Sequence, residues 1–352
     1  MRGHLLAVAA APVAVLLATL LLLLAQRGLA HGTGTDLPLV AVLTTPLLST
    51  DKRITALDLV AGTASANVTS CFTGYYDSWI KSAGGRTVPL RYDAPRGEIR
   101  RILSSVNAVL FTGGEVKLKG DGQSPEDALY VDTAQFIYDA VVAFNQGGDF
   151  LPLWGTCMGF QTISIVASRN ASVLELNGFD SESLSLPLDL TAAAGSSPFI
   201  SSLSPDVRAN LATKNITSNL HHDGVTPAAF AGTNLFTSFN VLSTNVDRKG
   251  KKFVSTIEHR SLPIAATQWH PERPQFEFKA GTGINHSATA VSAMQEVANY
   301  FVGLARQSSH SFDSEAEMLR SLIFNTPPVW MGNSELVYLF APQAEGSNHT
   351  SG

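Results

Sequence analysis

Residues 150–161 read FLPLWGTCMGFQ, and they place Cys157, one of only two cysteines, between two glycines directly after an apolar run. The run Phe150–Trp154 predicts a buried strand, and the residues from Met158 to Ala167 predict the helix that follows it. G-x-C-x-G at a strand-to-helix junction is the pattern of a nucleophile elbow, a turn so tight that the residues beside the nucleophile must be small. The stretch therefore predicts an α/β fold with a thiol at the carboxyl edge of its sheet.

This cysteine has two interpretations. A lone cysteine is most often a small buried hydrophobe. A helix N-terminus, however, favours the thiolate, because the aligned peptide dipoles stabilise negative charge there. The flanking glycines and the junction favour Cys157 as a nucleophile.

Strand and helix patterns alternate on both sides of this stretch. Short apolar runs at 37–43, 88–90 and 106–111 predict buried strands, and the pattern at 75–82 predicts a helix. Two late strands, at 253–258 and 264–269, are joined by a turn and followed by a helix at 290–305. The alternation predicts a three-layer α/β fold with a mostly parallel sheet covered on both faces.

The clearest single helix begins after Ser124, which can cap it, with Pro125 in the first turn. Helical spacing predicts a buried face made of Leu129, Phe136, Ile137, Ala140 and Phe144. The segment 181–205, rich in Ser, Leu, Ala and Pro, is expected to run over the surface. No repeat or linker interrupts the chain, which favours one domain.

The composition bounds the function. The 352 residues are 45% hydrophobic and 15% charged, which is typical of a globular protein with a large core. A net charge of −5 and a pI near 6.0 argue against a nucleic-acid partner. The one basic cluster, at 247–252, contains a glycine and is typical of a hairpin turn.

The N-terminus predicts entry into the secretory pathway. Arg2 precedes an uncharged stretch from Leu5 to Ala25, and small residues at Gly28 and Ala30 mark a cleavage site. These features predict a signal peptide over residues 1–30 and a single mature domain over residues 31–352. An uncleaved signal anchor is the alternative, because the stretch is long enough to span a bilayer. No second run of that length follows, so no stable membrane insertion is expected after cleavage.

Glycosylation sequons support the same pathway. The Asn-x-Ser/Thr triplets begin at Asn67, Asn170, Asn215, Asn285 and Asn348.

A thiolate nucleophile needs a base, and the sequence QWHPE at 268–272 offers one. His270 and Glu272 lie two residues apart, so their side chains share a face if the chain is extended, and Pro271 disfavours the helical conformation of His270. Glu272 would then orient the imidazole. Taken alone, the stretch more often indicates a capped strand end carrying exposed polar groups.

A third motif, FTGG at 111–114, follows a predicted strand. A glycine pair there lets backbone N–H groups point into the site. The N–H groups of Gly114 and Met158 are the candidates for holding an oxyanion. A simple tight turn is the alternative.

Strand-Gly-Gly, then G-x-C-x-G, then H-P-E, in this order, resembles the class I glutamine amidotransferase superfamily, which has a Cys-His-Glu triad on a flavodoxin-like core. Within it, the gamma-glutamyl hydrolase (folylpolyglutamate hydrolase) family is the more similar, over nearly the whole mature chain. The stretches that carry this resemblance are SAGGRTVPL, VNAVLFTGGEVKL, FLPLWGTCMGFQ, NVLSTNVD, FVSTIEHRSLPIAATQWHPE and PPVWMGNSELVYLF. Thr112 departs from the pattern, because family members often have proline there.

The resemblance implies Cys157 as nucleophile, His270 as base, Glu272 as its orienting acid and His221 near the substrate. For His221 a surface loop position is the alternative. The resemblance also implies a small-molecule substrate, poly-γ-glutamylated folates, and no cofactor or metal. It implies a lysosomal, vacuolar or extracellular location and allows a homodimer, although no interface can be identified. Two other functions remain: a glutamine-hydrolysing amidotransferase and a catalytically silent secreted binding glycoprotein.

Overall fold

The structure is a computed structural model that describes residues 34–47, 68–331 and 335–341. The predicted signal peptide and the sequons at Asn67 and Asn348 lie outside these residues, and the single mature domain stays a prediction. Among the described helices, none is both long and apolar enough to cross a membrane.

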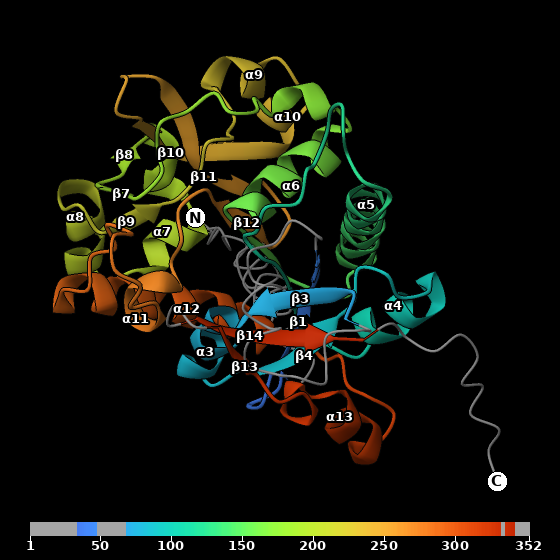
Figure 1. Cartoon of the computed structure of the whole chain (residues 1–352). Coiled ribbons are helices and arrows are strands. Elements are labelled where there is room, and N and C mark those ends of the chain that lie inside the picture. Colours follow the sequence, from blue (N-terminus) through green and yellow to red (C-terminus); the bar gives the residue numbers. More distant parts are fainter. Residues whose placement is uncertain (1–33, 48–67, 332–334, 342–352) are drawn as a thin grey trace, which may run out of the picture.

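An eight-stranded sheet lies at the centre of the molecule (Figure 1). Its strands, in spatial order, are β4 (Arg86–Leu90), β1 (Leu39–Leu43), β5 (Ala108–Phe111), β6 (Leu153–Thr156), β12 (Ile264–Thr267), β11 (Lys252–His259), β10 (Phe239–Val246) and β8 (Asp189–Leu190). The first five are parallel to one another and the last three pairings are antiparallel. When the five parallel strands are numbered by their order in the sequence, their spatial order is 2-1-3-4-5, which is the flavodoxin-like order.

Helices cover both faces of this sheet, as predicted. The alternation of side chains along a strand divides β1 between two cores: Leu39, Ala41 and Leu43 pack into one cluster, and Val40 and Val42 into the other. The covering helices are α4 (Arg96–Leu103), α5 (Pro125–Gln146) and α6 (Met158–Ser168) on the first face, and α3 (Gly74–Ser82) and α12 (Ala288–Ala305) on the second.

Two smaller sheets and several short helices complete the described fold. A four-stranded sheet joins segments from both ends of the chain, β13 (Val329–Met331), β14 (Glu335–Phe340), β3 (Ser70–Thr73) and β2 (Thr45–Pro46). The remaining elements are β7 (Leu184–Leu186), β9 (Thr217–Asn219), α7 (Pro198–Ser202), α8 (Pro205–Thr213), α9 (Pro227–Ala231), α10 (Leu235–Ser238), α11 (Arg273–Phe276) and α13 (Glu315–Ser321), with 3-10 turns at Ala171–Val173, Ala192–Ser196 and Ile323–Asn325.

The predicted cap of α5 is confirmed, whereas its predicted buried face is partly wrong. Ser124 Oγ accepts from the Asp127 N–H and the Asp127 carboxylate accepts from the Ser124 N–H, each at 3.0 Å. The residues that face the core are Tyr130, Ala134, Ile137, Tyr138 and Val141, and Leu129 is 41% exposed.

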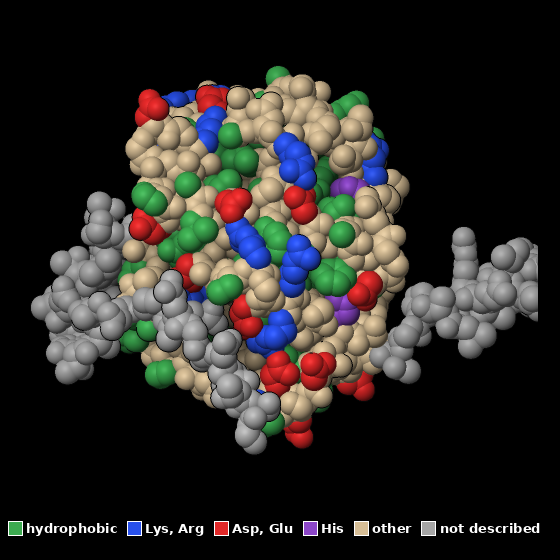
Figure 2. Space-filling view, turned by 90° about the vertical axis from the view of Figure 1, so that its right-hand side faces the viewer, with side chains coloured by type: hydrophobic (Ala, Val, Ile, Leu, Met, Phe, Trp, Pro, Cys, Tyr) green, Lys and Arg blue, Asp and Glu red, His purple; other side chains and the backbone are tan. Residues whose placement is uncertain are grey.

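Phe136 is only partly buried: it packs against the first core cluster, and two arginines cover its ring as well. The guanidinium groups of Arg96 and Arg100 lie 4.9 Å and 5.1 Å from the ring centroid of Phe136. Figure 2 views the molecule from the side on which α4 and α5 lie in Figure 1, and shows basic, acidic and apolar side chains interspersed there.

The segment 181–205 runs over the surface only in part: both residues of β8 are exposed, but other residues enter the core. It contributes β7, β8 and α7, and buries Leu188, Phe199 and Leu203. Two of its Ser-Pro pairs start helices: Ser197 Oγ caps α7, whose first residue is Pro198, and Ser204 Oγ caps α8, which begins at Pro205. Sequence composition alone does not distinguish such helix starts from exposed loop residues.

The basic cluster at 247–252 forms the predicted hairpin turn between β10 and β11. Gly250 has φ 79°, and the Asp247 side chain accepts backbone N–H groups from Lys249 and Lys251.

Candidate active site

Cys157 lies in a strained turn between β6 and α6. Its backbone has φ 54° and ψ −108°, a conformation that costs a non-glycine residue about 1–3 kcal/mol. A Cβ on Gly155 would lie 2.7 Å from the carbonyl oxygen of Gly159, and one on Gly159 only 2.1 Å from that of Phe111. The two glycines are therefore required by close backbone contacts, as the elbow motif predicts.

Two strands bring the elbow to the H-P-E stretch. The N–H of Cys157 donates to the carbonyl of Thr267, the last residue of β12, at 2.8 Å. The N–H of His270 then donates to the Ser218 carbonyl at 2.9 Å, which holds the chain beyond β12 in an isolated bridge. His270 is thus fixed three residues beyond the strand that neighbours the nucleophile.

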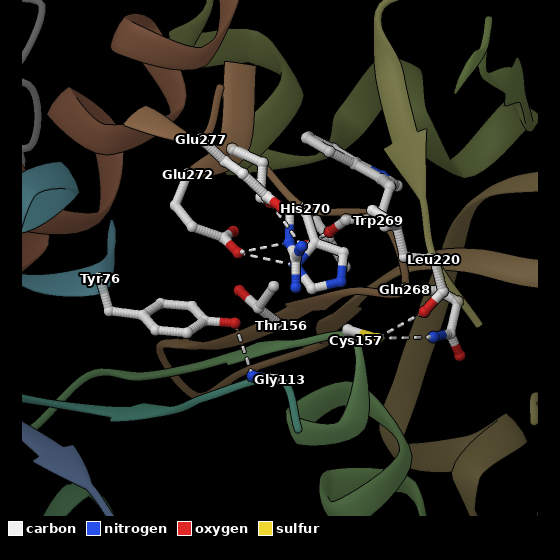
Figure 3. Close-up of polar contacts among 12 residues, drawn as sticks. Tyr76, Gly113, Thr156, Cys157, Leu220, Gln268, Trp269, His270, Glu272 and Glu277 are labelled. Carbon is white, nitrogen blue, oxygen red and sulfur yellow. Dashed lines mark hydrogen bonds and ion pairs between the residues drawn. The ribbon is translucent and has the colours of Figure 1, made fainter. Parts of the chain in front are cut away.

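His270 and Glu272 form a buried pair. Nδ1 of His270 lies 2.6 Å from Oε1 of Glu272, and each residue is 1% exposed (Figure 3). Nε2 of His270 makes no hydrogen bond within the described part of the chain, so it is available to the nucleophile. The predicted orienting contact is present.

Gly113 shows how near Cys157 and His270 are to each other. A Cβ at Gly113 would lie 2.9 Å from Cε1 of His270 and 3.4 Å from Cβ of Cys157. Figure 3 shows the cysteine side chain below the imidazole ring. The N–H of Gly113 donates to the Tyr76 hydroxyl at 2.6 Å, so α3 anchors the glycine loop beside both side chains.

The charges in the site favour a protonated His270. Burial has the largest effect on its pKa and lowers it, and the charge of Arg273 lowers it further; Glu272 and the sulfur of Cys157 act in the opposite direction and raise the pKa to about 9. For Glu272, burial raises the pKa, but His270 and Arg273 outweigh burial and hold it below the usual value. The pair therefore favours an imidazolium beside a carboxylate.

Arg273 is a third charge in this cluster. Its Nε lies 3.0 Å from Nδ1 of His270 and 3.6 Å from Oε1 of Glu272, and its Nη1 lies 2.5 Å from Oε2 of Glu277. Since Nδ1 of His270 donates its proton to Glu272, it cannot also accept one from Arg273. Arg273 therefore acts on this pair through its charge.

His221 lies in the interior rather than in a surface loop. It is 4% exposed and packs edge-on against Phe253, with ring centroids 4.8 Å apart. Its Nδ1 donates to the carbonyl of Asp223 at 2.9 Å, which leaves Nε2 as a lone-pair acceptor with no partner in the described chain. Burial lowers its pKa to about 3, so the ring is neutral.

The two oxyanion candidates lie on adjoining elements. Met158 is the first residue of α6, and a Cβ on Gly114 would lie 3.1 Å from Cε of Met158. That their N–H groups face a substrate oxygen stays a prediction.

The sulfur of Cys157 has two polar neighbours that the sequence did not identify. The amide Nε2 of Gln268 lies 3.8 Å from Sγ, and the carbonyl oxygen of Leu220 lies 3.9 Å from it (Figure 3). Gln268 stands inside the QWHPE stretch, and this position beside His270 was the only available signal. Tyr76 and Arg273 likewise required the folded chain to be recognised.

The remaining predicted residues lie away from this cluster. Asn170 and Asn215 are exposed, whereas Asn285 is half-buried and its Nδ2 donates to the Asn215 carbonyl at 2.8 Å. Cys71 lies in β3 of the second sheet and is not joined to Cys157 by a disulfide, so Cys157 carries a free thiol, as predicted.

Comparisons with known proteins identify the family of this chain. The model of the family described as peptidase C26 matches residues 54–187, and that of glutamine amidotransferase class-I matches residues 139–280. Gamma-glutamyl hydrolase B of Dictyostelium discoideum is 35% identical over 269 residues, 75% of each chain. Gamma-glutamyl hydrolase of Homo sapiens is 32% identical and covers 73% of this chain and 78% of its own. This chain belongs to the gamma-glutamyl hydrolase family and is a cysteine-type hydrolase.

Proposed function

We propose that this protein hydrolyses γ-glutamyl bonds in folylpoly-γ-glutamates, and in similarly modified antifolates, through a thioester on Cys157. The observation that carries the proposal is the buried His270–Glu272 pair beside a free thiol held at a strained turn. Its relatives are named gamma-glutamyl hydrolases, which indicates that the bond cleaved is a γ-glutamyl bond. The resemblance of the sequence to folylpolyglutamate hydrolases indicates that the substrate is a folate.

In the first step, the thiol proton of Cys157 moves to Nε2 of the neutral His270 ring. This transfer forms the imidazolium that the charges of the site favour, and the sulfur keeps the electron pair. The sulfur attacks the γ-carbonyl carbon, and the carbonyl π electrons move to the oxygen. The N–H groups of Met158 and Gly114 hold this oxyanion.

In the second step, the oxyanion collapses and the carbon–nitrogen bond breaks. The departing amine takes the proton from Nε2 of His270, which leaves a thioester. Water then attacks the thioester carbonyl and gives one proton to His270. Collapse of this second oxyanion breaks the carbon–sulfur bond and releases the γ-carboxylic acid, which loses its proton to solvent, and the thiolate, which takes back the proton from His270. Glu272 holds the imidazole through Nδ1 in every step, and all the groups used belong to the chain, the substrate or water.

The N-terminal signal and the sequons belong to the same proposal, with the mature enzyme acting in the lysosome, the vacuole or the extracellular space. Exposed Asn170 and Asn215 are accessible for glycosylation.

A product time course on pteroylpenta-γ-glutamate, followed by mass spectrometry, tests the proposal. We expect shorter γ-linked products, and no products from the α-linked isomer. Rapid hydrolysis of free glutamine with intact pentaglutamate would instead support the amidotransferase alternative. The absence of any product would support a silent binding protein.

A further inference from the structure

Gln268 is a completely buried amide next to the sulfur, and the steps above give it no role. It directly follows β12, and its backbone N–H donates to the Ser255 carbonyl at 2.8 Å. Its side-chain Nε2 lies 3.8 Å from Sγ of Cys157. A buried amide beside a reactive sulfur can either donate to it or accept from it, and which of these occurs depends on the orientation of the amide.

A second buried glutamine fixes that orientation. Nε2 of Gln161, on α6, donates to the backbone carbonyl of Asp223 at 3.0 Å and to Oε1 of Gln268 at 3.3 Å. A carbonyl oxygen only accepts, so Gln161 must direct its NH2 group toward Asp223. Gln268 must then direct its oxygen toward Gln161 and its NH2 group toward the sulfur.

The two polar neighbours of Sγ therefore suit two different states of the cysteine. A thiol can donate its proton to the Leu220 carbonyl, 3.9 Å away. Once the proton has moved to His270, the sulfur is an acceptor only, so the Leu220 carbonyl repels it and the Gln268 N–H attracts it. In a buried site these contacts are poorly screened.

We propose that Gln268 is a further catalytic residue, which holds the thiolate of Cys157 with its side-chain N–H, and that Gln161 is a positioning residue, which sets the orientation of Gln268. Gln268 forms and breaks no covalent bond; it accompanies the transfer of the thiol proton to His270. This inference deepens the proposed function, because it rests on Cys157 as the nucleophile.

The test is the pH dependence of iodoacetamide labelling of Cys157, read by peptide mass mapping. We compare the full chain with Gln268→Met, Gln268→Glu and Gln161→Met, each checked for folding by circular dichroism. Gln135→Met is the matched control, since Gln135 bonds Asp139 within α5.

Gln268→Met should move the midpoint of labelling to higher pH by about one unit, the size expected for loss of a hydrogen bond to a charged group. Gln268→Glu, which places a negative charge near the sulfur, should move the midpoint further. Gln161→Met should move the midpoint in the same direction by a smaller amount, and Gln135→Met should leave the midpoint unchanged.

Midpoints that coincide for the full chain, Gln268→Met and Gln161→Met would overturn the inference. If Gln268→Met does not fold, Gln161→Met decides alone, because the side chain of Gln161 bonds the amide of Gln268 and makes no described bond to the sulfur. A full chain whose Cys157 is no more reactive than Cys71 would contradict the proposed function itself, which is a distinguishable result.

Discussion

Nδ1 of His270 and Oε1 of Glu272 lie 2.6 Å apart, with both residues only 1% exposed. In this setting the carboxylate both orients the imidazole and stabilises its protonated form.

We predict that Glu272→Gln lowers kcat by about 10²–10⁴-fold with little change in KM, because the amide keeps the shape but loses the charge. Steady-state kinetics on a γ-linked diglutamate of pteroate measure this. Glu296→Gln, which alters an acid bonded to Ser204, is the control. A loss of less than threefold in Glu272→Gln would contradict the assigned role.

Stability should depend on pH through two histidines. The pKa of His270 is raised to about 9 in the folded protein, so its contribution is complete below about pH 6.5 and is lost as the pH rises toward 9. The pKa of buried His221 is lowered to about 3 in the folded protein. As the pH falls below about 6.5, the unfolded chain takes up a proton at this residue and the folded protein does not, so stability falls toward pH 3.

Urea denaturation between pH 4 and 9 should therefore give a maximum near pH 6.5. His270→Gln should flatten the alkaline limb and His221→Gln the acidic limb. Unchanged slopes in these variants would show that other groups control the pH dependence.

Tyr76 links α3 to the glycine loop. We predict that Tyr76→Phe lowers the free energy of unfolding by about 1–3 kcal/mol and also lowers kcat, because the partly buried N–H of Gly113 loses its acceptor. Tyr138→Phe, on α5, also removes a phenolic hydroxyl, but far from the loop, and is the control for kcat. Full activity in Tyr76→Phe would mean that the loop keeps its position without this bond.

The elbow glycines can be tested by paired alanine substitutions. Gly159→Ala should destabilise the fold by about 3 kcal/mol or more, since its Cβ would overlap the carbonyl oxygen of Phe111. Gly303→Ala, within α12 and with open space around it, should be neutral or stabilising by up to about 1 kcal/mol. Thermal unfolding of both variants measures the difference, and equal melting temperatures would contradict the close contact.

The sequence predicted the parallel strands, the turn at Cys157 and the contact of His270 with Glu272, because each depends on local patterns: apolar runs, glycines at an elbow, and a two-residue spacing. It could not predict that β3 pairs with β14, because the paired residues, such as Cys71 and Leu339, are far apart in the sequence. It also missed Gln161 and Gln268. Their importance comes from a hydrogen-bond chain between separate segments, and one residue in a sequence does not reveal such a chain.

Cys157 is proposed as the nucleophile for γ-glutamyl hydrolysis, and every step above depends on it. The most direct measurement is glutamate release from pteroylpenta-γ-glutamate by Cys157→Ala, beside the unaltered chain and Cys71→Ala. We predict no detectable release by Cys157→Ala, with an unchanged circular dichroism spectrum and melting temperature, and substantial release by Cys71→Ala. Release by Cys157→Ala at the rate of the unaltered chain would contradict this role of Cys157.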